Sequence, residues 1–233
     1  KQRQIADLWT AAFFWKHEEP IGKSLEIVAP THGQLRRLRN GSQTQGGLLD
    51  QVQKLSQAES FFHWPLEFAE VAVQGGFDCV LGNPPWERIK LQEEEYFAAR
   101  DPEIAASQNK TARQKLIDLL PQTNPNLATD FTTAKHSAEG TSKFMRTTGR
   151  YPFTAVGDVN TYALFSEHCR ILISASGYCG IIVPTGIATD DTTKEFFGDL
   201  VDKRALARLF DFENREKLFP AVDSRMKFCL LTL

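Results

Sequence analysis

Residues 75–86 read Gly-Gly-Phe-Asp-Cys-Val-Leu-Gly-Asn-Pro-Pro-Trp. The two glycines introduce a short apolar run over residues 77–81, which we expect to form a buried strand. Gly82 and the Pro84-Pro85 pair end this run, because proline has no N–H to donate to a strand ladder. The stretch therefore predicts a strand that is followed directly by a sharp loop.

The sequence after Tyr151 extends this pattern by alternating helix and strand signals. It predicts helices at about 160–174 and 191–203, and strands at 178–183, 205–212 and 225–233. Such alternation is typical of an α/β layer with a largely parallel sheet. Ligands of these sheets bind beyond the carboxyl ends of the strands. The loops at 82–86, 184–189 and 211–219 are therefore the candidate site.

Local signals refine the two helices. We expect Asp158 to cap the first helix and Gly177 to end it. Its predicted apolar face consists of Leu164, Phe165, Cys169 and Leu172. In the second helix, Thr192-x-x-Glu195 resembles a capping box.

The first part of the chain is predicted to be helical over residues 3–17 and 47–60, with a Gly/Pro/Thr-rich loop around 29–33. The basic cluster at 36–39 is interpreted as a solvated helix face, with phosphate contact as the alternative. Residues 87–150 are polar and helix-like, with breaks expected at Pro121, Pro125 and Gly140. We divide the chain into a helical segment (1–60), a strand with its loop (61–92), a helical insertion (93–150) and an α/β remainder (151–233).

Composition indicates an ordinary globular chain. The 233 residues are 42% hydrophobic and 24% charged, with a net charge of −2. No apolar run approaches the ~20 residues that span a bilayer. The cysteines lie singly in apolar segments, which predicts reduced, buried thiols in a cytoplasmic protein without a metal site; they are Cys79, Cys169, Cys179 and Cys229. Because the chain starts at Lys1 and ends inside the apolar run 228–233, we expect a fragment of a larger protein.

The loop Asn83-Pro84-Pro85-Trp86 after a hydrophobic strand resembles the catalytic motif of amino-group DNA methyltransferases, and its Asn form resembles the N6-adenine enzymes. With the flank at 62–68, the string through 76–86 is similar to the large methyltransferase subunits of type IIG restriction-modification enzymes and of BREX- and DISARM-type phage-defence systems. The resemblance implies the C-terminal half of a Rossmann-like methyltransferase fold with helical insertions. It also implies S-adenosylmethionine as cofactor, double-stranded DNA as substrate, and other restriction or defence subunits as partners.

The chemistry of this loop agrees with the resemblance. The amino nitrogen of adenine is a poor nucleophile because its lone pair is delocalised into the ring. The side-chain carbonyl of Asn83 and the backbone carbonyl of Pro84, held by proline's fixed φ, can accept the amino hydrogens and localise that lone pair. The Trp86 ring offers a stacking face for an extruded base. A plain turn with an aromatic residue packed on the core is the alternative.

Three more residues enter through the resemblance. Residues 157–165 match the helix after the catalytic loop, which implies that Phe165, and with it Asp158, lies near the cofactor. Phe165 as ordinary core is the alternative. Residues 211–225 match the segment whose aromatic sandwiches the flipped base, and Phe219 stands at that position; a buried anchor beside Pro220 is the alternative. Arg225 and Lys227 either contact DNA phosphate or settle on the surface.

Parts of the family pattern are missing from the 233 residues. There is no Asp-Pro-x-x-Gly-x-Gly cofactor loop, and no target-recognition domain or acidic nuclease arrangement is visible. Two other functions stay open. A protein glutamine methyltransferase uses a similar Asn-Pro-Pro-Tyr loop, although the insertion at 87–150 argues against it. A non-catalytic defence subunit that holds DNA or partners is the third reading.

Overall fold

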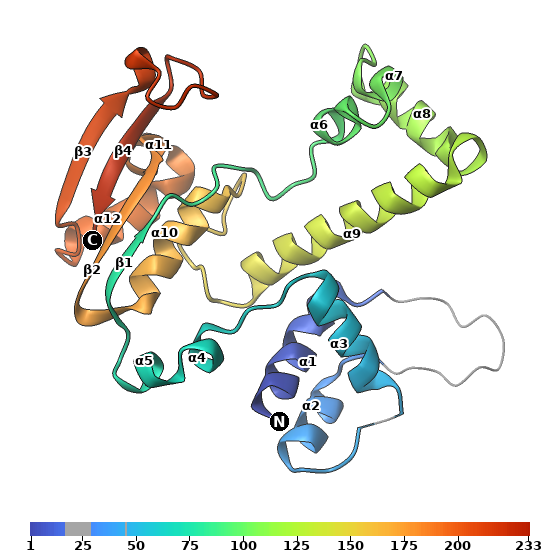
Figure 1. Ribbon diagram of the computed structural model, residues 1–233, viewed down its shortest axis with the longest axis horizontal. Coiled ribbons are helices and arrows are strands. Elements are labelled where there is room, and N and C mark those ends of the chain that lie inside the picture. The colour runs from blue at the N-terminus through green and yellow to red at the C-terminus, as the bar shows by residue number, and fades with distance from the viewer. Residues whose placement is uncertain (17–28, 45) are drawn as a thin grey trace. The chain divides into compact units, whose positions relative to one another are not determined.

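The computed structural model describes residues 1–16, 29–44 and 46–233. The chain divides into two compact units (Figure 1). The helical unit combines Lys1–Phe61 with Lys90–Phe144, and the sheet unit combines Phe62–Ile89 with Met145–Leu233. Each unit is thus built from two stretches of chain, and each is described by itself.

The first stretch of the helical unit contains α1 (Gln2–Phe14), α2 (His32–Arg39) and α3 (Leu48–Ala58). Their inward residues form one apolar cluster, which includes Leu8, Ala11, Leu35, Leu38, Leu48 and Val52. The predicted helices at 3–17 and 47–60 are confirmed, although α1 already ends at Phe14, and His17 lies outside the described residues. The loop at 29–33 ends at Thr31, whose hydroxyl caps α2 by accepting from the N–H of Gln34.

The second stretch holds α6 (Glu93–Ala98), α7 (Pro102–Ala105), α8 (Lys110–Thr123) and α9 (Pro125–Thr147). The expected helical character is confirmed, but two of the expected breaks are wrong. Pro121 lies in the last turn of α8. Gly140 lies inside α9, where a Cβ would come within 2.7 Å of the Phe14 ring. Glycine at 140 therefore permits close packing and does not end the helix.

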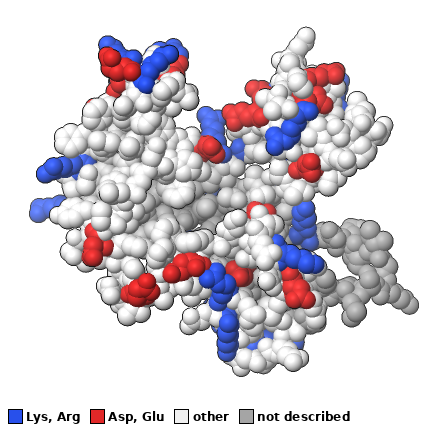
Figure 2. Space-filling view, viewed as in Figure 1, with Lys and Arg blue, Asp and Glu red and all other residues white. Residues whose placement is uncertain are grey.

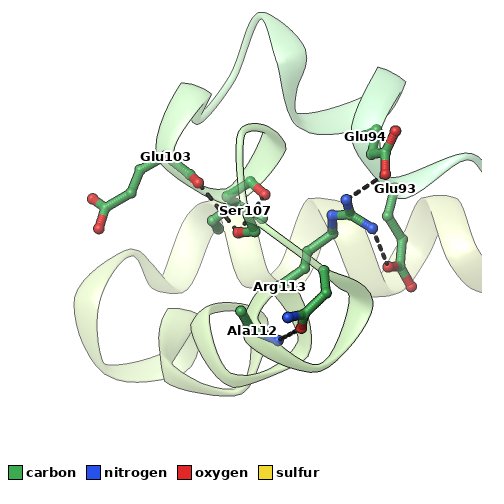
Figure 3. A network of polar contacts seen from close by, with 8 residues as sticks. Glu93, Glu94, Glu103, Ser107, Ala112 and Arg113 are labelled. Carbon is green, nitrogen blue, oxygen red and sulfur yellow. Dashed lines mark hydrogen bonds and ion pairs between the residues drawn. The ribbon is translucent and has the colours of Figure 1, made fainter.

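A buried arginine ties α8 to α6 (Figure 3). The guanidinium of Arg113 is only 8% exposed, and it forms ion pairs with Glu94 and, at 3.8 Å, with Glu93. A buried cation requires such partners because its desolvation is otherwise uncompensated. This pair of carboxylates accounts for an arginine inside a small helical core.

The sheet unit is built on four strands in the order β1-β2-β4-β3. Their bounds are β1 Phe77–Gly82, β2 Ile173–Pro184, β3 Arg208–Glu213 and β4 Lys227–Thr232. β1 and β2 are parallel, whereas β4 is antiparallel to both β2 and β3. The expectation of a largely parallel sheet is therefore corrected to a mixed one. β3 and β4 are joined without an α-helix, only the short 3-10 turn η2 (Asn214–Glu216) and a loop, and parallel pairing normally needs a helical crossover.

Helices α10 (Thr161–Leu172), α11 (Gly186–Thr189) and α12 (Lys194–Asp202) pack with the sheet in one core (Figure 1). Within this unit, side chains on the other side of the sheet stay exposed, among them Leu81 (78%) and Phe210 (53%). The prediction that residues 77–81 are buried is wrong, because only Phe77 and Val80 are partly buried and the uncovered side of the sheet continues over β1. Cys79 is exposed for the same reason, while the other three cysteines are buried. The result is a mixed α/β fold, consistent with a methyltransferase-like one.

Short elements complete the sheet unit: α4 (Trp64–Glu67), α5 (Ala69–Val73) and η1 (Asp191–Thr193). Gly76, with φ of 127°, lies where β1 begins, and a Cβ there would come within 2.7 Å of the carbonyl oxygen of Leu172. Only glycine allows this approach of β1 to the end of α10.

Several local expectations for α10 and α12 are wrong. Asn160, not Asp158, caps α10 by accepting from the N–H of Tyr162. The helix ends at Leu172, so β2 begins at Ile173 and Gly177 lies inside the strand. The capping box at 192–195 does not form, because the N-cap is Thr193 and its hydroxyl donates to the carbonyl of Gly186.

The predicted apolar face of α10 also differs from the observed one. Phe165 is 41% exposed, whereas Ser166 and Glu167 are buried. The Ser166 hydroxyl donates to the carbonyl of Tyr162, and the Glu167 carboxylate accepts from the backbone N–H and hydroxyl of Thr154. These polar residues are buried at little cost because their hydrogen bonds are satisfied.

Candidate active site

Three loops meet at one edge of the sheet, as expected. Because β4 is antiparallel to both neighbours, β1, β2 and β3 share one direction and their carboxyl ends lie together. The indole N–H of Trp86, after β1, donates to the carbonyl of Ile182 in β2 at 3.3 Å. The hydroxyl of Thr185, after β2, donates to the carboxylate of Asp211 in β3.

The loop Asn83–Trp86 combines an exposed amide with an anchored ring. Asn83 is exposed, and its side chain has no hydrogen-bond partner in the part of the chain that the structure describes. Trp86 is half-buried and packs against the core of the sheet unit. The packing of the indole agrees with the plain-turn alternative, but that alternative gives no role to the free carboxamide of Asn83.

The backbone of this loop is held by the first residue of α10. The Thr161 hydroxyl lies 2.6 Å from the carbonyl oxygen of Pro85 and accepts from the N–H of Glu87 at 3.0 Å. The Thr161 N–H donates to the carbonyl of Glu87 at 2.8 Å. These bonds fix the chain on the carboxyl side of the Asn83–Trp86 loop without covering Asn83.

The structure brings Trp86 and Phe219 together. Their ring centroids lie 6.3 Å apart with an interplanar angle of 69°, an edge-to-face contact. A base stacked between two rings needs them parallel and about 7 Å apart, twice the ~3.5 Å contact distance of carbon atoms. In the observed geometry the rings touch, so a sandwiched base requires the Phe219 ring to turn and move away from Trp86.

A single buried asparagine shapes the loop that carries Phe219. Asn214 is 1% exposed, and its amide nitrogen donates to the carbonyls of Phe219 and Val222, both at 3.0 Å. Its amide oxygen accepts from the N–H of Phe219, also at 3.0 Å. Lys217 lies between Asn214 and Phe219 in the sequence. Its backbone is left-handed with φ of 48°, a conformation that costs energy for a residue with a side chain.

Phe165 lies one helical turn after the residue of α10 that contacts the Asn83–Trp86 loop. It follows Thr161 by four residues, so both lie on the same side of α10, and Thr161 contacts Pro85. The alternative of Phe165 as ordinary core is wrong, because the ring is 41% exposed. An exposed aromatic ring can stack on the adenine ring of S-adenosylmethionine. Its role as a cofactor contact stays a prediction.

Asp158 is less suited to that cofactor. Its carboxylate pairs with Arg88 at 3.3 Å, and both residues line a hollow of about 180 Å³ with Tyr162 and Asp190. Burial, together with the neighbouring Asp190 carboxylate, raises the pKa of Tyr162 to about 12. The polar side chains that line this hollow therefore interact with one another, Arg88 with Asp158 and Tyr162 with Asp190.

Arg225 is exposed and pairs with Asp223, and its contact with DNA phosphate stays a prediction. Its guanidinium makes two bonds to Asp223, at 2.8 and 3.0 Å, and this pairing holds the pKa of Asp223 well below its usual value. Sequence reasoning missed Thr161 and Asn214. Their positions are the signal that could have found them. Thr161 begins the helix α10, and Asn214 directly follows the strand β3.

Comparison with known proteins gives one match. The model of the family described as Eco57I restriction-modification methylase matches residues 22–120. That range includes β1 and the Asn83–Trp86 loop, and it supports a DNA methyltransferase of the restriction-modification type. No curated protein and no solved structure matches the chain.

Two further observations concern the described residues alone. None of their helices is long and apolar enough to cross a membrane. No group of three or more metal-ligating side chains gathers among them.

Proposed function

We propose that the protein is a DNA adenine-N6 methyltransferase of a restriction-modification or phage-defence system, and that it acts with S-adenosylmethionine on a flipped base in double-stranded DNA. One observation carries the proposal: the exposed carboxamide of Asn83 follows β1 at the sheet edge where the Trp86 and Phe219 rings meet. An acceptor for an amino group thus lies beside two stacking surfaces. The family match at 22–120 supports the methyltransferase class.

In this proposal each residue has a defined task. The Asn83 side-chain oxygen and the Pro84 carbonyl accept hydrogen bonds from the two N–H groups of the adenine amino group. The lone pair of the amino nitrogen is then available to attack the methyl group. Trp86 and Phe219 stack on the base, and Phe165 faces the cofactor. S-adenosylmethionine supplies the electrophilic methyl group. We further propose that other restriction or defence subunits accompany the protein.

The test is methyl transfer by the full-length protein from labelled S-adenosylmethionine, with the methylated base identified after digestion. We expect N6-methyladenine, and a loss of about 100-fold or more in Asn83→Ala, comparable to removing one oxyanion-hole donor. Asn83→Asp, which keeps a side-chain acceptor, serves as the control and should retain more activity. Wild-type activity in Asn83→Ala, or methylation of a release-factor glutamine peptide but not of DNA, would contradict the proposal.

A further inference from the structure

The outward face of α2 carries a cluster of positive charge. At 100° per residue, the buried residues Gln34, Leu35 and Leu38 occupy one side of the helix. His32, Arg36 and Asn40 fall on the opposite side, with Arg37 and Arg39 at its two flanks. We call His32, Arg36, Arg37, Arg39 and Asn40 the α2 basic face. It is presented by a helix whose other side is fixed in the helical unit's core.

The α2 basic face is hollowed, and the described part of the chain places no acidic partner on its arginines. A hollow of about 440 Å³ is lined by His32, Gly33, Leu35, Arg36, Arg39 and Asn40. Among the described residues, Arg36, Arg37 and Arg39 form no ion pair. By contrast, Arg88 is held by Asp158 and Arg170 by Asp199. As far as residues 1–16, 29–44 and 46–233 are concerned, the guanidinium groups of α2 are therefore open to an external anion.

Charge is concentrated here against the trend of the molecule. Figure 2 shows acidic and basic side chains interspersed over the face that it draws. Residues 1–61 hold eight Lys or Arg and six Asp or Glu, a formal charge of +2, while the whole chain carries −2. Basic residues in a last helical turn favour the helix dipole, but Arg36 and Arg39 are like charges at i and i+3, which opposes that gain.

We propose that the α2 basic face binds the phosphate backbone of DNA. This inference rests on the proposed function for its choice of polyanion. Arginine suits the role because its planar guanidinium donates to two phosphate oxygens at once, and the hollow between Arg36 and Arg39 admits a phosphate group. Such contacts position DNA without reading its sequence.

The test is the salt dependence of binding to a fluorescent 30-base-pair DNA duplex by the full-length protein, measured by anisotropy between 50 and 200 mM KCl. Each phosphate contact contributes about −0.9 to the slope of log K against log salt. Replacing Arg36, Arg37 and Arg39 by Gln should therefore reduce the slope by about 2.7. Over this fourfold salt range, the wild type should lose about 40-fold more affinity than the variant.

The matched control replaces Lys110, Lys115 and Lys135 by Gln, an equal charge change at exposed positions of the same unit. Its slope should stay at the wild-type value, and so should that of the Arg→Lys triple variant, which keeps the charge. The inference is overturned if the slope of the Gln variant is unchanged, or if the lysine control loses as much slope as the Gln variant. It is also overturned if the arginines bind an acidic peptide in place of DNA. DNA binding is measured without methyl transfer, so failure of the catalytic proposal is seen separately, as absent methylation by the wild-type protein with its DNA binding intact.

Discussion

The Thr161 hydroxyl donates to the carbonyl oxygen of Pro85 at 2.6 Å, so the first turn of α10 fixes the loop that carries Asn83. The same oxygen accepts from the N–H of Glu87. Thr161→Val keeps the shape of the side chain and removes both bonds. If Asn83 acts on the substrate, a displacement of about 1 Å should cost roughly 100-fold in rate. We therefore expect kcat of the full-length protein to fall by 10- to 100-fold while KM for S-adenosylmethionine changes little.

Thr161→Ser is the control for this prediction because it keeps the hydroxyl. It should restore most of the lost kcat. The site is exposed enough for water to replace the lost bonds, so the free energy of unfolding of Thr161→Val should drop by only ~1 kcal/mol. If Ser is as defective as Val, or Val turns over like wild type, Thr161 does not position the loop.

Asn214 offers a pH-dependent test of the Phe219 loop. In Asn214→Asp, an ionised carboxylate would face the carbonyls of Phe219 and Val222, which now accept hydrogen bonds from the amide nitrogen. Burial should raise the pKa of this new carboxyl above its unfolded value. The cost of burying the ionised carboxylate is therefore absent at low pH, and it grows as the pH rises from the unfolded toward the folded pKa. We expect faster amide exchange in residues 217–226 at pH 8 than at pH 5, after correction for intrinsic exchange.

Asn214→Ala is the matched control because it removes the same bonds without adding a titratable group. Its loop exchange, relative to wild type, should be nearly independent of pH. A pH profile shared by both variants would show that charge in the asparagine's place is not what opens the loop.

The elements that could be predicted are those set by hydrophobic pattern and chain direction. The run at 77–81 is a strand, and the carboxyl ends of the same-direction strands bring the loops of Trp86 and Phe219 together. These features depend on many residues at once, so single exceptions do not obscure them.

The contacts that organise the site could not be predicted, because each depends on a partner distant in sequence. Its charge predicts that Glu167 faces solvent, yet Glu167 is buried and accepts a hydrogen bond from Thr154. With Glu167 on the buried side of α10, Phe165 lies on the exposed side. The exposure of β1 has the same origin, since an apolar run indicates a strand but not which neighbours cover it.

Gly76 should be among the least replaceable residues of the sheet unit. A Cβ there would lie 2.7 Å from the Leu172 carbonyl oxygen, and the backbone has φ of 127°. Gly76→Ala therefore combines backbone strain of ~1–3 kcal/mol with a clash that β1 must shift to relieve. Gly75→Ala is the control, since Gly75 also has positive φ but faces open space. Urea titration should show a clearly larger loss of unfolding free energy for Gly76→Ala, and equal losses would contradict the close approach.

Tyr162 should make the fold sensitive to alkali. Its pKa is raised to about 12, first by burial and then by Asp190, whereas an unfolded chain has a tyrosine pKa near 10. Because the folded pKa is the higher one, this stability is fully present below about pH 10 and is lost as pH rises toward 12. Two pKa units correspond to roughly 2–3 kcal/mol.

Tyr162→Phe cannot ionise, so its unfolding free energy should fall less steeply between pH 10 and 12, as measured by urea titration. Cys229, with a pKa raised to about 11, titrates in both proteins and contributes to the raised pKa of Tyr162, so the difference between the two slopes reports Tyr162 together with its interaction with Cys229. Identical slopes would mean that Tyr162 ionises in the folded state as easily as in the unfolded chain.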